Sequence, residues 1–115
     1  MIRDYLKEHI LIADGAMGTY YDQKKSENGR IAEEANLLEP ELIQRIHEEY
    51  LESGAQLIRS NTFAANRSVA LRKGIELKAE QDAYIRSVVQ SAWNNAKVAV
   101  KRASGERFIA ANIGP

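Results

Sequence analysis

Three short groups of polar and glycine residues have the types and spacing to bind a small molecule. The first is Asp14-Gly15, continued by Met17, Gly18 and Thr19. A carboxylate here could accept hydrogen bonds from an ammonium group, and glycine lets the backbone approach a ligand closely. A tight turn that requires glycine explains the same residues equally well. The group is not a dinucleotide-binding fingerprint, because the third glycine is missing and no helix is expected directly after it.

The second and third groups carry hydroxyl and amide side chains. Ser60, Asn61 and Thr62 are three adjacent hydrogen-bonding residues, and Asn112 comes shortly before Gly114. They could hold the carboxylate or amine of a substrate. They could instead cap a following helix, a role that Ser, Thr and Asn perform well. The residues alone leave both interpretations open.

His47 is a candidate for acid–base chemistry, but its position favours a structural role. It lies in a predicted helix, beside an apolar stripe and among Arg45, Glu48 and Glu49. A catalytic histidine needs a partner within hydrogen-bond reach. The candidate partners lie at the strand ends, and a residue in the middle of a helix is not expected to reach them. We therefore expect a packed or paired histidine.

Three short apolar runs precede the three polar groups. These runs are residues 10–13, 55–58 and 108–110. Short continuous runs of this kind are typical of strands buried on both faces, as in a parallel sheet. Polar or glycine-rich residues follow each run, so each predicted strand ends where a candidate binding group begins.

Helical periodicity fills the intervals between these runs. We predict helices from Pro40 to the residue before Gly54, over residues 64–73 and over residues 78–103. Proline suits the first helical position and glycine the position after the end. Residues 22–35 are polar and charged, which indicates a surface excursion, and residues 15–19 are expected to form a loop.

Strands that alternate with helices predict an α/β fold with a parallel sheet. In such folds the carboxyl ends of the strands meet at one edge, and ligands bind there. The three polar groups should therefore share one rim.

The composition of the 115 residues excludes several classes of protein. Sixteen Lys and Arg balance sixteen Asp and Glu, which argues against a nucleic-acid-binding surface. Cysteine is absent, so the chain has no disulfide, thiolate metal ligand or cysteine nucleophile. No apolar run is long enough to span a membrane, and the N-terminus does not resemble a signal peptide. We expect a cytoplasmic protein with no membrane partner.

The motifs together resemble the homocysteine S-methyltransferase domain family. They are ILIADGAMGT, EEANLLEPELIQRIHEEYLESGAQLIRSNTFAANR and ANIGP, in this order, covering about residues 10–115. The forms DGAMGT and NTF are similar to those of cobalamin-dependent methionine synthases and of bacterial fusions with methylenetetrahydrofolate reductase. The resemblance implies a (β/α)8 barrel, of which residues 1–115 would be an N-terminal fragment with the first three βα units.

The resemblance also implies methyl transfer to the sulfur of homocysteine, which gives methionine. Residues that match the family's homocysteine pocket are Asp14, Gly15, Met17, Gly18, Thr19, Asn61, Thr62, Phe63 and Asn112, with Gly114 beside the last. The family's zinc is held by three cysteines, which this chain lacks, so we assign no metal ligand and no catalytic residue. We expect the isolated chain to be inactive. Methyl-cobalamin and methyltetrahydrofolate both remain open as methyl donors.

A second hypothesis concerns the open edges that three parallel strands would leave. Unpaired strand edges and uncovered apolar faces favour association. The chain could be a non-catalytic unit that forms a homo-oligomer through these edges, or an unrelated amino-acid-binding module.

Overall fold

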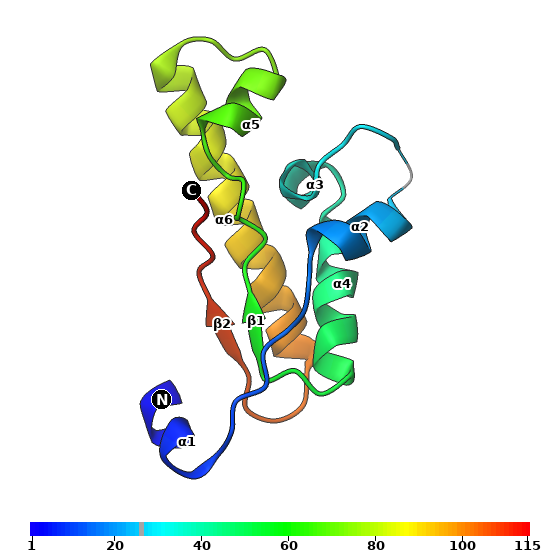
Figure 1. Cartoon of the computed structure of the whole chain (residues 1–115), viewed down its shortest axis with the longest axis vertical. Coiled ribbons are helices and arrows are strands. Elements are labelled where there is room, and N and C mark those ends of the chain that lie inside the picture. The colour runs from blue at the N-terminus through cyan, green and yellow to red at the C-terminus, as the bar shows by residue number, and fades with distance from the viewer. Residues whose placement is uncertain (26) are drawn as a thin grey trace.

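The computed structural model describes residues 1–25 and 27–115. Helices and strands follow in the order α1 (Ile2–Glu8), α2 (Gly18–Lys24), α3 (Ala32–Leu38), α4 (Pro40–Glu52), β1 (Leu57–Arg59), α5 (Arg67–Arg72), α6 (Lys78–Arg102) and β2 (Phe108–Ala110). The strands run roughly along the long helix α6, with α4 beside it (Figure 1). The mixed α/β class expected from the sequence is confirmed.

The sheet has two parallel strands, β1 and β2, with Ile58 opposite Ile109. The first apolar run, residues 10–13, joins them through a single parallel bridge between Ala13 and Leu57. The expectation that this run forms a strand buried on both faces is therefore wrong. Ile10 is 88% exposed and Ile12 56% exposed, because no described element covers them.

Helices α4 and α6, which were both predicted from their periodicity, form the layer behind the strands. Helix α4 begins at Pro40, whose missing N–H is not needed there, and Gly54 follows its end with a φ of 111°. Small residues on α6 allow close packing. Ala96 and Ala99 lie in a buried cluster with Leu51 of α4 and Ile58 of β1.

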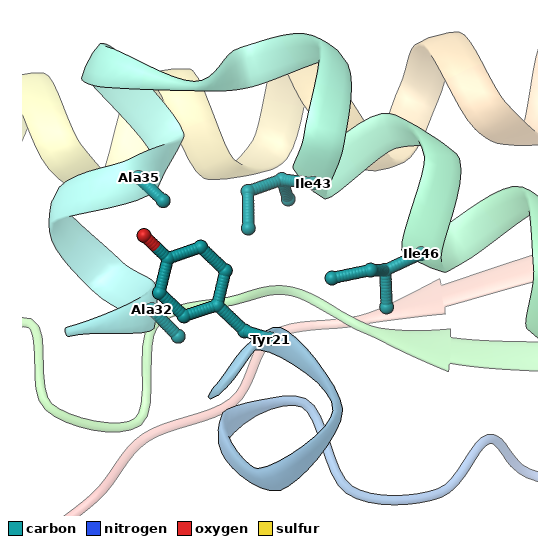
Figure 2. Close-up of a cluster of buried hydrophobic side chains, with 5 residues drawn as sticks. All are labelled: Tyr21, Ala32, Ala35, Ile43 and Ile46. Carbon is teal, nitrogen blue, oxygen red and sulfur yellow. The ribbon is translucent and has the colours of Figure 1, made fainter. Parts of the chain in front are cut away.

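A second cluster joins α2, α3 and α4 (Figure 2). The Tyr21 ring lies between the alanines of α3 and the isoleucines of α4, and the members are Tyr21, Ala32, Ala35, Ile43 and Ile46. The surface excursion expected over residues 22–35 is therefore wrong for residues 32–35, which are buried in α3, whereas residues 22–24 and 27–29 are exposed as expected and residue 26 lies outside the described residues. The charged residues suggested an exposed segment, but Glu33 and Glu34 are buried with polar partners. Glu33 accepts a hydrogen bond from the Ala64 N–H, and Glu34 forms ion pairs with Arg72 and Lys73.

The remaining helices are short. Helix α5 covers only part of the predicted residues 64–73, because Asn66 caps its start by accepting a hydrogen bond from Ser68 N at 3.0 Å. Helix α2 begins at Gly18, so only residues 15–17 remain of the loop expected over 15–19. Helix α1 was not predicted. None of the described helices is long and apolar enough to cross a membrane.

Candidate functional site

A cavity of about 180 Å³ lies where the strands end. Its walls come from three separate segments and comprise Asp14, Gly15, Ala16, Met17, Gly18, Arg59, Ser60, Asn61, Phe63 and Asn112. The parallel arrangement of β1, β2 and the bridge at Ala13 brings these segments to one edge. All the residues expected at this rim line the cavity except Thr19, Thr62 and Gly114.

The charged groups of the cavity are paired with each other. Arg59 Nε donates to Asp14 Oδ1 at 2.8 Å, and the backbone N–H of Arg59 donates to Asp14 Oδ2 at 3.1 Å. Arg59 Nη2 also donates to the carbonyl oxygens of Asp14 and Gly15, each at 3.1 Å. Both carboxylate oxygens are thus engaged, and the Asp14 side chain is only 4% exposed.

Arg59 belongs to the segment RSNTF that was expected at the rim, but no binding role was expected of it. Side chains alternate between the two faces of a strand, and Ile58 is buried while Arg59 is exposed. The sequence feature that could have identified Arg59 as a site residue is therefore a basic residue at the last position of a strand, on the face away from the core.

Asn61 directs its side-chain amide nitrogen toward α3. Its Nδ2 donates to the carbonyl oxygen of Ala32 at 2.6 Å and to Asn36 Oδ1 at 3.2 Å. The side chain is buried in this position. Asn61 thus anchors the cavity wall to a neighbouring helix.

Two hydroxyl groups fasten the end of β2 to the end of β1. Ser60 Oγ lies 2.9 Å from Thr62 Oγ1, and it accepts a hydrogen bond from the backbone N–H of Asn112 at 3.2 Å. Thr62 Oγ1 donates to the carbonyl oxygen of Asn112 at 2.5 Å. These residues do not cap the next helix, because Asn66 has that role. The alternative of helix capping is therefore wrong for residues 60–62.

The glycines of the rim differ in what surrounds them. A Cβ at Gly15 would lie 3.0 Å from the Tyr50 ring, and one at Gly114 would lie 2.0 Å from the carbonyl oxygen of Phe63. Gly18 has open space around it. Close contacts therefore explain why glycine is needed at positions 15 and 114. Packing does not explain the glycine at position 18.

Met17 lines the cavity, whereas Thr19 does not. Met17 is partly buried against the Tyr21 cluster, so it also serves the core. Thr19 instead lines a separate cavity of about 310 Å³, together with Tyr20, Glu49 and Tyr50.

His47 of α4 is completely buried. Neither ring nitrogen has a hydrogen-bond partner within residues 1–25 and 27–115. Burial lowers the pKa of His47 to about 4, and the negative charge of Asp14 acts in the opposite direction. The histidine is therefore packed rather than paired, and it is neutral near pH 7.

The residues present do not fit a zinc site. Cysteine is absent from the sequence, and in the described part of the chain no three His, Asp or Glu side chains are grouped to hold a metal. The arrangement can bind a small polar molecule between a charged pair, backbone groups and the Phe63 ring, which is 55% exposed.

Comparisons with known proteins agree with the motifs. A family model described as homocysteine S-methyltransferase matches residues 11–115. Methionine synthase of Mycobacterium tuberculosis is 33% identical over 72 residues, which cover 56% of this chain and 6% of that protein.

Two crystal structures of the homocysteine methyltransferase MmuM from Escherichia coli share the fold. The oxidised form has a TM-score of 0.79 and the metallated form 0.71, each at 22% identity over 99% of this chain. The chain covers 40% and 41% of those two chains. It therefore spans less than half the length of the relatives it matches.

Proposed function

The chain belongs to the homocysteine S-methyltransferase family, and from this premise we propose that its rim cavity is part of a homocysteine-binding pocket. The chain would supply the first three βα units of a (β/α)8 barrel. One observation carries the proposal: residues 14–18, residues 59–61, Phe63 and Asn112 meet in one cavity at the carboxyl ends of parallel strands. Barrel enzymes bind their substrates at that end of the strands.

The cavity would hold the amino-acid end of homocysteine. Asp14 and Arg59 supply opposite charges for a zwitterion, and Gly15 and Gly18 leave the backbone accessible. Thr62 and Asn112 hold the two strand ends together. The exposed ring of Phe63 offers an apolar surface for the methylene groups.

Methyl transfer needs groups that the chain does not supply. No described cluster could hold the zinc that would bind the substrate sulfur in this family. We propose that the chain alone binds the substrate without transferring a methyl group. Methyl-cobalamin and methyltetrahydrofolate both remain open as donors, because we assign no residue of the cavity to either.

Titration of the full chain with reduced L-homocysteine, followed by amide NMR, tests the proposal. We expect saturable shifts of the Gly15, Gly18 and Asn61 amide signals, while the amide signal of Ala99, which is buried where α6 packs against α4, stays unchanged. Butanethiol, which lacks the amino-acid end, serves as the control ligand and should not cause these shifts. Absence of saturable change up to about 10 mM homocysteine would contradict the proposal.

A second candidate function is self-association, favoured by exposed apolar side chains at both sides of the sheet. Phe63, Val89, Trp93 and Ile113 line a cavity of about 380 Å³ beside β2, and Ile12 is exposed at the opposite edge. A second copy of the chain could cover both surfaces.

Light scattering over a concentration series tests this candidate. A dimer that Trp93→Glu disperses would support it, with Leu71→Glu as the control because Leu71 is exposed but lies outside that cavity. A monomer at high concentration would rule it out.

A further inference from the structure

Asn28 and Gly29 lie in the turn between α2 and α3, and both residues are exposed. We propose that Asn28 is a site of spontaneous deamidation, at which the backbone nitrogen of Gly29 attacks the side-chain amide, and that the isoaspartate formed there releases the turn from Arg72. The proposal is independent of the proposed function, because neither residue of the turn lines the rim cavity.

The reaction at Asn28 needs water and no other reactant. The backbone nitrogen of Gly29 gives up its proton and bonds to Cγ of Asn28, and the side-chain nitrogen leaves as ammonia. Water then opens the resulting cyclic imide at either of its carbonyl groups, which gives aspartate or isoaspartate. In isoaspartate the main chain runs through Cγ, so the backbone at this position is longer by one methylene group.

The surroundings of Gly29 leave this reaction unobstructed. Glycine has no Cβ to keep its nitrogen away from the preceding side chain, and a Cβ built at this position would meet nothing within 4 Å. Gly29 also lies outside the helices, so its nitrogen is not held in a helical hydrogen bond. The turn itself requires glycine, because the φ of Gly29 is +83°.

The structure protects the other positions where related chemistry could occur. Asp14 is also followed by glycine, but its side chain is 4% exposed and both carboxylate oxygens accept hydrogen bonds from Arg59. Asn94 is exposed but lies inside α6, where helical hydrogen bonds hold the backbone around it. No other asparagine of the sequence precedes a glycine. Asn28 is therefore the position at which a following glycine and exposure coincide.

The turn is anchored by contacts that a longer backbone would displace. The Gly29 carbonyl oxygen accepts a hydrogen bond from Arg72 Nη2 at 2.8 Å, which ties the turn to α5 across 43 positions of sequence. The next residue, Arg30, pairs with Glu27 at 2.9 Å and with Glu39 at 3.0 Å. Hydrogen bonds weaken steeply once distance and angle leave their usual range. An added methylene group next to Gly29 should therefore break the bond from Arg72.

Incubation of the purified full chain in mildly alkaline buffer, followed by peptide mass spectrometry, tests the modification. Each product carries one more negative charge than a chain whose formal net charge is zero, so anion exchange separates it. We expect Asn28 to convert at least about tenfold faster than Asn94, the exposed control inside a helix. Asn28→Gln should stop the conversion, because its longer side chain would have to close a larger ring. Equal rates at Asn28 and Asn94, or no conversion at Asn28, would overturn the proposal.

Urea unfolding of the separated isoaspartyl form tests the release of the turn. Arg72→Gln should lower the unfolding midpoint of the unmodified chain more than that of the isoaspartyl form, in which the bond to Gly29 is already lost. Asn28→Asp, which adds the charge without the methylene group, should respond to Arg72→Gln as the unmodified chain does.

Lys73→Gln is the matched control for the unfolding measurement. Lys73 and Arg72 both pair with Glu34, but Lys73 forms no described contact with the turn. Lys73→Gln should therefore lower the midpoints of both forms equally. Equal effects of Arg72→Gln on the two forms would overturn the release of the turn, while the modification of Asn28 would stand.

Discussion

Asn36 and Asn61 are bonded to each other in both directions. Asn36 Nδ2 donates to the carbonyl oxygen of Asn61 at 2.7 Å, and Asn61 Nδ2 donates to Asn36 Oδ1 at 3.2 Å. The backbone carbonyl of Asn36 also accepts hydrogen bonds from Ser91 and Asn95 of α6. A buried polar network therefore connects the cavity wall to α3 and to the longest helix.

Asn36→Ala should destabilise the chain by about 3 kcal/mol, because it leaves the buried carbonyl of Asn61 without its partner and removes one of the two hydrogen bonds of Asn61 Nδ2. Urea unfolding measures the change. Asn94→Ala is the control, since Asn94 is exposed on α6, and its effect should stay within about 0.5 kcal/mol. Equal effects of the two substitutions would show that the network contributes little.

The same network explains which parts of the fold the sequence could predict. Helices α4 and α6 carry apolar residues at helical spacing, and both strands coincide with short continuous apolar runs, so local patterns located all four elements. Helix α3 buries Glu33, Glu34 and Asn36, whose polarity suggested the surface. Their burial depends on partners from α5, α6 and the segment after β1, which no local pattern can show.

The rim of the site was predictable because it depends only on strand order. Parallel strands place the residues that follow them at one edge, which brought Asp14, Phe63 and Asn112 together. The directions of the side chains were not predictable, since they depend on contacts across the sheet. Asn61 points to α3, and Arg59 pairs with a residue 45 positions away.

Gly15→Ala should destabilise the chain by about 1–2 kcal/mol. Its Cβ would meet Cε1 and the hydroxyl oxygen of Tyr50 at 3.0 Å, so the ring must shift and weaken its 2.7 Å hydrogen bond to the Ala16 carbonyl. Thermal unfolding and the Tyr50 ring resonances report this change.

Gly18→Ala is the matched control, because its Cβ meets nothing within 4 Å at the first residue of α2. Alanine also favours a helix over glycine. We expect unchanged or slightly higher stability. If both alanine variants unfold at the temperature of the unaltered chain, the contact with Tyr50 does not constrain Gly15.

The purified chain should retain much less than one zinc ion per molecule. It has no cysteine, and its described residues lack a cluster of metal-binding side chains. Elemental analysis after dialysis against zinc and removal of free metal measures this quantity. Stoichiometric zinc that resists dialysis would overturn the assignment of no metal ligand.

His47 should make the stability of the chain depend on pH. Burial lowers its pKa in the folded state from 6.5 to about 4, so between these values the unfolded chain binds a proton that the folded chain does not. As far as His47 is concerned, the free energy of unfolding should therefore be highest above pH 6.5 and should decrease as the pH falls to 4. One pKa unit corresponds to about 1.4 kcal/mol, so the loss approaches about 3 kcal/mol.

His47→Leu should flatten this dependence, because the variant has no imidazole to protonate. At pH 7.5 the variant should be as stable or about 1 kcal/mol more stable, since leucine removes two ring nitrogens that have no partner among the described residues. Urea unfolding at pH 4.5, 6 and 7.5 gives the three free energies. His9→Gln is the control, because His9 is exposed. This substitution should leave the pH dependence of the free energy of unfolding unchanged. A slope that persists in His47→Leu would assign the acid sensitivity to other groups.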